Sequence, residues 1–323
     1  GCLCLDGKGR LLAGDAGAKT IKVLSTDGKL LSELKPGLPA EAIAVAPDGA
    51  IYCGGGGKLA ELTADGKVVR TVPLPTDAAS DMPRRRNKRG NQVSGIAVTK
   101  DYVFATIGSG WSVGAKAKLF RFNRELGDPK VLLTGLRGCC QRCDIKVHDG
   151  IIYIAENGAY RVVRMTPEGK VLGRWGERGR TGDAGFGSCC NPMNLCFGKD
   201  GNLYTAESGL GRIKRYTADG KFLDLVGYAG VARFNRASGL AAACSNIAIV
   251  ATANGDRVFA MDFKQGRIRV LERKAKGKAA KCLKRVVPNG IKGDQRLAVM
   301  RALFVSELAT ELGLSAFDNT PLL

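Results

Sequence analysis

The stretch "CDIKVHDGIIYIAENGAYRVVRMTPEGKVLGRWGERG" (residues 143–179) decides the fold, because a second copy, "NLCFGKDGNLYTAESGLGRIKRYTADGKFLDLVGYAG" (194–230), starts 51 residues later. Both copies read as a strand, an Asp-Gly turn, a second strand ending in Ala-Glu, a glycine-containing turn, a third strand opening with arginine, and a fourth strand. Asp-Gly between two apolar segments is typical of a tight β-hairpin turn. Each copy therefore predicts a unit of four short antiparallel strands.

The same order of strands and turns recurs along most of the chain. The apolar residues that anchor the first strand of each unit are 40 to 53 residues apart: Leu3, Ile43, Ile96, Ile145, Leu195 and Leu240. Hairpin pairs repeated at this period are typical of propeller blades, because radial repetition leaves only short, protected sheet edges. We therefore predict an all-β fold, a six-bladed β-propeller of four-stranded antiparallel blades. The approximate blade boundaries are 1–37, 38–76, 84–135, 136–179, 180–230 and 231–272.

Residues 273–323 do not continue the repeat. The run "ERKAKGKAAKCLKR" (272–285) is basic and predicts a solvated linker. In "DQRLAVMRALFVSELATELG" (294–313) the apolar residues fall on one helical stripe, Asp294 can cap the start, and Gly313 can end the helix. The sequence thus predicts a short C-terminal α-helical tail after a propeller spanning residues 1–272. The helix can dock on the propeller flank or bind a partner.

Composition narrows the classes of partner. Lys and Arg number 50 against 30 Asp and Glu, which gives a formal charge of +20 and favours an acidic protein partner or an anionic small molecule. Nucleic acid is disfavoured, because aromatic residues make up only 6% and no nucleic-acid-binding module is visible. No apolar run reaches the length of a membrane span. The one histidine, His148, excludes a three-histidine zinc site.

The repeat text resembles the NHL-repeat family of six-bladed propellers, most closely in "IYIAENGAYRVVRMTPEGKVL" (152–172) and "LYTAESGLGRIKRYTADGKFL" (203–223). The resemblance implies an acidic residue after the second strand and an arginine that opens the third. These positions hold Glu156 with Arg161 and Glu207 with Arg212. In the last unit they hold Asn254 with Arg257, so the acidic residue is replaced by asparagine. A carboxylate that pairs with the guanidinium and accepts turn N–H groups would fix the hairpin. We interpret these pairs as structural.

Propeller geometry then converts the alignment of blades into positions in space. The first strand of each blade lines the central channel, and the loop that leads into it lies on one face near the axis. Residues at the start of these strands form a ring of equivalent positions: Cys2, Ala42, Gly95, Asp144, Asn194 and Gly239. The doublets Cys139–Cys140 and Cys189–Cys190 lie in the lead-in loops of adjacent blades. With Cys143, they are expected at one mouth of the channel.

Several chemistries fit this group of Cys139, Cys140, Cys143, Cys189 and Cys190. The doublets can form disulfides that make up the floor of a ligand pocket, and disulfides suit an exported protein. No secretory signal is visible at Gly1. Alternatively, the Cys140–Cys143 spacing and the second doublet can hold Zn, Cu(I) or an iron–sulfur cluster, since soft sulfur selects these metals. Unmodified thiols are the third possibility. The sequence leaves these alternatives open.

A different site on the axis is also expected. Glu41, Asp144 and Asn194 have similar positions and offer oxygen ligands of the kind that Ca²⁺ prefers. The "NPMNL" segment (191–195) is similar to the strand approach of gluconolactonase and SMP-30 propellers, and this distant resemblance implies a divalent cation there. A basic rim is expected on the same face from Arg84, Arg85, Arg86, Arg89 and Arg142, where it would attract an acidic partner.

The sequence therefore predicts a binding or redox-type β-propeller with a cysteine-lined site at the mouth of the channel. That site would hold a metal, an iron–sulfur centre or a disulfide-floored ligand pocket. The alternatives are a metal-dependent lactonase or hydrolase of the SMP-30 type, which would use the axial oxygens, and a protein-interaction scaffold, which would use the basic rim. Fold alone does not decide among them.

Overall fold

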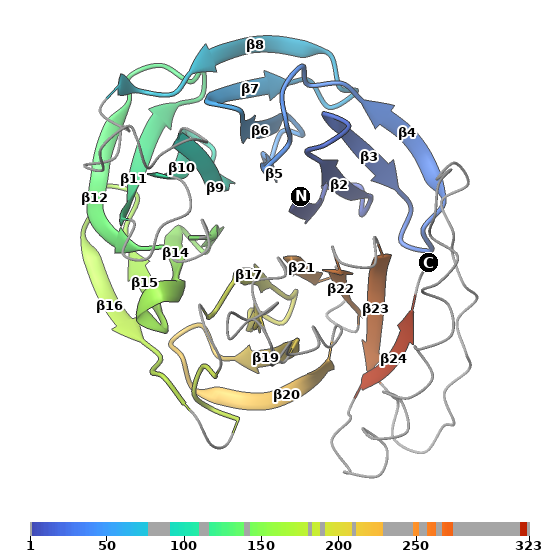
Figure 1. The fold of residues 1–323 in the computed structure, drawn as a ribbon, viewed down its shortest axis with the longest axis vertical. Helices are drawn as coiled ribbons and strands as arrows, with labels where there is room; N and C mark the ends of the chain where they lie inside the picture. The colour runs from blue at the N-terminus through green and yellow to red at the C-terminus, as the bar shows by residue number, and fades with distance from the viewer. Residues whose placement is uncertain are drawn as a thin grey trace, which may run out of the picture.

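The computed structural model describes residues 2–76, 91–109, 116–138, 143–179, 183–187, 191–208, 211–228, 248–251, 257–262, 267–273 and 317–321. Their strands form six four-stranded antiparallel sheets. Figure 1 shows the sheets arranged as blades around a central axis, with β4, β8, β12, β16 and β20 on the outer rim. The predicted all-β propeller with four-stranded antiparallel blades is confirmed.

Five sheets follow the sequence units in chain order, each running from an inner to an outer strand. The first two contain β1 (Cys2–Leu5), β2 (Leu11–Asp15), β3 (Thr20–Leu24) and β4 (Leu30–Leu34), then β5 (Ala42–Val45), β6 (Ile51–Gly55), β7 (Lys58–Leu62) and β8 (Val68–Pro73). The third contains β9 (Asn91–Val98), β10 (Tyr102–Ser109), β11 (Lys116–Asn123) and β12 (Lys130–Arg137). The fourth contains β13 (Ile145–His148), β14 (Ile151–Glu156), β15 (Arg161–Met165) and β16 (Val171–Trp175), with the 3₁₀ turn η2 (Asn157–Ala159). The fifth contains β17 (Asn194–Phe197), β18 (Leu203–Ala206), β19 (Arg212–Tyr216) and β20 (Phe222–Tyr228).

The sixth sheet departs from the predicted unit. It contains β21 (Ala248–Ala251), β22 (Arg257–Asp262), β23 (Arg267–Arg273) and β24 (Phe317–Pro321). Its outer strand β24 comes from the segment expected to follow the propeller, and it pairs with β23. The outer edge of β23 needs a partner, and a distant strand supplies it. The helix expected at 294–313 and the first strand expected at Leu240 lie outside the described residues.

The core lies between the blades. Ile145 of β13 packs toward the third blade with Phe104 and Leu119. Leu195, at the equivalent position of β17, packs toward the fourth blade with Tyr153 and Val162. The inner strands lie so close that a Cβ on Gly95 would come 2.8 Å from the Ile145 amide nitrogen. This packing fixes where each inner strand begins. Among the described residues, no helix is long and apolar enough to cross a membrane.

Candidate functional site

A polar pocket lies on the axis, where the inner strands begin. It contains about 330 Å³ of space, including its open mouth. Its lining comes from five blades: Cys2, Leu3, Glu41, Ala42, Ile43, Ser94, Gly95, Ile96, Asp144, Lys146 and Asn194. Five of the six positions in the predicted ring line this one pocket, and the sixth, Gly239, lies outside the described residues. Glu41, Asp144 and Asn194 all line this pocket.

Asp144 joins the fourth blade to the fifth. It directly precedes β13, and its Oδ2 accepts a hydrogen bond of 2.9 Å from the backbone N–H of Leu195 in β17. Its Oδ1 lies 2.8 Å from Nζ of Lys146, two residues further along the same strand. The Lys146 ammonium also donates to the Ile145 carbonyl at 3.1 Å. Both carboxylate oxygens of Asp144 are thus engaged, one by a neighbouring blade and one by an ammonium.

Cys2 of the ring, and the residues directly before two other ring positions, also contact the blade that follows them. Glu41 Oε2 accepts a hydrogen bond of 3.4 Å from the Val93 amide of β9. Cys2 Sγ lies 3.4 Å from the Ala40 carbonyl of the second blade. The Ser94 hydroxyl donates to Thr106 at 3.0 Å, and the Thr106 hydroxyl donates to the Cys143 carbonyl at 2.5 Å. The residues at the start of the inner strands therefore connect neighbouring blades and also line the pocket.

The pocket does not fit the calcium site that the sequence implies. Calcium takes six to eight oxygen ligands, usually with several carboxylates. Here the Asp144 carboxylate already carries the Lys146 ammonium and the Leu195 N–H, which leaves Glu41 and Asn194 as the other expected ligands. In the described part of the chain no group of three His, Cys, Asp or Glu side chains is placed to hold a metal ion.

The expected cysteine site is described only at Cys143, since Cys139, Cys140, Cys189 and Cys190 lie outside the described residues. Cys143 is buried in an apolar cluster with Ile145 and Leu136, and burial raises the pKa of its thiol, with smaller contributions from Glu156 and Asp144. A metal ligand must be a thiolate, which this environment disfavours. Within the described ranges, all five cysteines carry thiols rather than disulfides: Cys2, Cys4, Cys53, Cys143 and Cys196.

The segments that precede the two doublets are held by equivalent acidic residues. Glu156 Oε1 accepts a hydrogen bond of 3.1 Å from the Arg137 amide, and its Oε2 lies 2.5 Å from Nε of Arg161. Glu207 Oε2 accepts a 3.4 Å hydrogen bond from the Gly187 amide and lies 2.7 Å from Nη2 of Arg212. Both acid–arginine pairs form as the resemblance implied. Their carboxylates, however, hold the lead-in segment two residues before each doublet rather than the turn.

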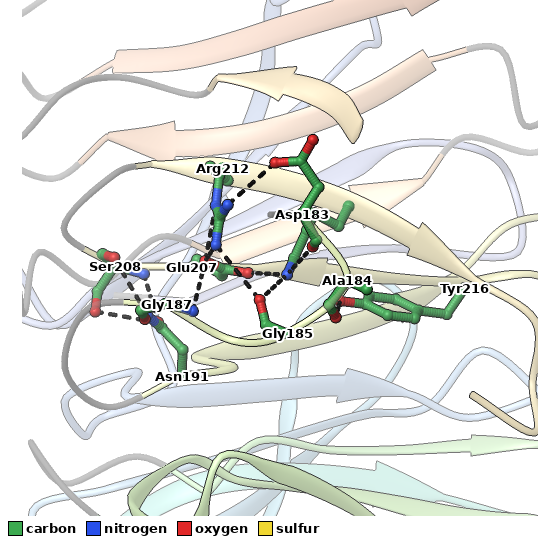
Figure 2. Close-up of polar contacts among 10 residues, drawn as sticks. Asp183, Ala184, Gly185, Gly187, Asn191, Glu207, Ser208, Arg212 and Tyr216 are labelled. Atoms are coloured by element: carbon green, nitrogen blue, oxygen red, sulfur yellow. Dashed lines mark hydrogen bonds and ion pairs between the residues drawn. The ribbon is translucent and has the colours of Figure 1, made fainter. Parts of the chain in front are cut away.

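The fifth blade extends this arrangement into a buried polar network (Figure 2). Lys214 and Glu207 form a fully buried ion pair, and the Lys214 ammonium also donates to the carbonyls of Asp183 and Gly185 at 2.8 Å. Desolvation lowers the pKa of Lys214, although Glu207 opposes that shift. The ammonium lies 4.8 Å from the ring centre of Phe186. The network fixes residues 183–187 onto the blade.

Asn191 fixes the lead-in loop on the other side of the second doublet. Its Oδ1 accepts hydrogen bonds of 2.7 Å and 3.1 Å from the backbone and hydroxyl of Ser208, and its Nδ2 donates to the Gly187 carbonyl at 2.5 Å (Figure 2). The Asn191–Pro192 peptide bond is cis. The basic-rim residues Arg84, Arg85, Arg86, Arg89 and Arg142 lie outside the described residues.

Sequence reasoning missed two lysines. Lys146 follows Asp144 by two residues on a strand, and this spacing places both side chains on the same face, so its position next to the carboxylate had a readable signal. Lys214 lies at a buried position of β19, where its contacts with Glu207 and with the carbonyls of Asp183 and Gly185 stabilise its charge. Lys146 neutralises a carboxylate that the sequence offers as a calcium ligand, whereas Lys214 adds a second cation to Glu207, which was expected to pair with Arg212.

Together the fold and the pocket define a β-propeller with a polar axial hollow. The chain matches no family model and no curated protein. Similar solved structures include a streptogramin B lyase, with a TM-score of 0.53 and 16% identity over 83% of this chain and 78% of the lyase. A protein of unknown function from Bacteroides thetaiotaomicron has a TM-score of 0.56 and 14% identity over 82% of this chain and 66% of its own. Regucalcin, a calcium-binding protein from Agrobacterium tumefaciens, has a TM-score of 0.50 and 14% identity over 85% and 81%.

At these identities the likeness shows the fold alone. The similar structures support the predicted β-propeller. Membership of the NHL-repeat family stays a prediction.

Proposed function

We propose that this chain is a ligand-binding β-propeller whose site is the axial pocket. The observation that carries the proposal is the convergence of Glu41, Asp144, Lys146 and Asn194, from three blades, on one hollow at the start of the inner strands. A small set of polar groups that converge in a concave site is typical of small-molecule binding. Its position on the axis lets adjacent blades contribute to recognition.

The charges of the pocket indicate the class of ligand. The described part of its lining contains two carboxylates, from Glu41 and Asp144, and the ammonium of Lys146. Asp144 and Lys146 neutralise each other at 2.8 Å, and Glu41 adds a second carboxylate to the lining. A molecule that donates hydrogen bonds, such as a small polyol or amine, fits this balance. A simple carboxylate would be repelled.

The experiment is a thermal-shift screen of the purified protein against small polyols, amines and monocarboxylates. We expect polyols or amines to raise Tm and monocarboxylates to leave it unchanged. Glu41→Gln and Asn194→Ala should remove the shift, while Glu33→Gln, an exposed carboxylate on the outer strand β4, should keep it. A shift that survives both pocket substitutions would contradict the proposal.

A second candidate is a thiol-based site made by the two cysteine doublets, as disulfides or as metal ligands. The supporting observation is that Glu156 and Glu207 hold the chain at equivalent points, Arg137 and Gly187, two residues before each doublet. Such repetition in adjacent blades is expected where two loops serve one site.

The test for this candidate is intact mass spectrometry with thiol alkylation, combined with elemental analysis of protein purified without oxygen. A mass lowered by paired cysteines would support disulfides, and stoichiometric zinc, copper or iron would support a metal site. Four alkylatable doublet thiols with no bound metal would exclude both forms.

A further inference from the structure

We infer that the Lys146 ammonium takes the position of a cation on the propeller axis, so that this pocket excludes divalent metal ions. The inference concerns the pocket's own charges and holds whether or not the proposed polyol or amine binds. It makes Lys146 the residue that determines which class of ligand the axis accepts.

The ammonium is held on two sides. Its Nζ lies 2.8 Å from Asp144 Oδ1 and donates to the Ile145 carbonyl at 3.1 Å. The Asp144 carboxylate is itself fixed, because its other oxygen accepts the Leu195 N–H of the next blade at 2.9 Å. Turning this carboxylate toward another cation would break an inter-blade hydrogen bond. Only 26% of the Lys146 side chain is exposed, so it forms part of the pocket wall.

A divalent cation would compete with this ammonium for the same oxygen. Calcium binds carboxylate oxygens at about 2.3–2.6 Å, so an ion on Asp144 Oδ1 would lie no more than about 5.4 Å from the Lys146 nitrogen, which is 2.8 Å from that oxygen. Like charges at that separation repel strongly in a partly desolvated site. The other carboxylate in the described lining belongs to Glu41, on the second blade.

Removing the ammonium reverses the balance. Without it, the described lining contains the carboxylates of Asp144 and Glu41 and the amide of Asn194. These are the oxygen ligands that calcium prefers. Substitution of one side chain should therefore create a weak cation site where the native protein has none.

The experiment is isothermal titration of chelator-treated protein with CaCl₂ to about 10 mM, above the range of weak calcium modules. The wild type and a matched control, Lys67→Met, which removes an exposed lysine next to β8, should show no saturable binding. Lys146→Met should bind one calcium ion with a Kd of about 1 mM or tighter. The double variant Lys146→Met with Asp144→Asn should lose that binding.

Two results would overturn the inference. One is stoichiometric calcium binding by the wild type that Asp144→Asn abolishes. The other is a folded Lys146→Met variant, shown by far-UV circular dichroism, that gains no binding. Lys146→Gln retains a polar side chain without the charge and is judged by the same criterion if methionine unfolds the protein. Failure of the polyol and amine screen leaves these calcium results unchanged, so the two failures can be told apart.

Discussion

Replacement of Glu207 by glutamine tests the buried network of the fifth blade. Glu207 and Lys214 are both fully buried, and the Arg212 side chain is only 7% exposed. Glutamine keeps the shape of the side chain but removes its charge, so two cations would remain in the interior without this carboxylate. Removing one partner of a buried ion pair costs about 3–5 kcal/mol. We expect a loss of that size in the free energy of unfolding.

The fourth blade supplies a matched control. Glu156→Gln removes the equivalent carboxylate, but its partner Arg161 is 37% exposed and can be solvated once the pair is broken. The expected loss is therefore smaller, about 1–2 kcal/mol. Urea unfolding followed by far-UV circular dichroism measures both variants. With an m-value of about 1–3 kcal/mol/M, the midpoints of the two variants should differ by about 1 M. Equal midpoints would refute the argument that burial sets the cost.

Gly95→Ala should lower the free energy of unfolding by about 1–3 kcal/mol, because the new Cβ would come 2.8 Å from the Ile145 amide nitrogen. Gly173→Ala should be near neutral in the same urea assay, because no atom lies within 4 Å of the Cβ position there. Burial raises the pKa of the Cys53 thiol from 9.0 to about 12. The stability that the neutral thiol contributes below pH 9 should therefore fall as the pH rises toward 12. A urea denaturation midpoint that increases above pH 9 would contradict this. Cys143 should resist iodoacetamide at pH 8 in the native protein and react in urea, as peptide mapping would show. Truncation before residue 317 removes β24 and exposes the edge of β23, and should lower Tm and promote aggregation; unchanged melting and light scattering would argue against this pairing.

The repeat predicted most of the propeller, because each unit carries its own local signals. Asp-Gly turns and alternating apolar residues define hairpins within a unit, and the register between units predicts that Asp144 and Asn194 occupy one ring, in agreement with the pocket that both residues line. The sixth sheet lacked such a signal. Its outer strand, β24, pairs with β23 across a long stretch of chain, and no local pattern encodes that contact.

The chemistry of the ring was harder to predict than its position. A carboxylate at the start of an inner strand can bind a metal, cap a neighbouring amide or pair with a lysine, and the sequence is the same in each case. The contacts of Asp144 with the Leu195 N–H and with Lys146 decide among these. Cys143 shows the same limit, since its burial among apolar side chains depends on how the third and fourth blades pack.

The central claim is that the axial pocket binds a small donor-bearing ligand. The most direct measurement is isothermal titration of the polyol or amine with the largest thermal shift into the wild type, Asn194→Ala and Glu33→Gln. We predict one site per chain, with equal affinity in the wild type and Glu33→Gln and a loss of at least about tenfold, or 1.4 kcal/mol, in Asn194→Ala. Equal affinity in all three proteins would place the ligand elsewhere and contradict the account.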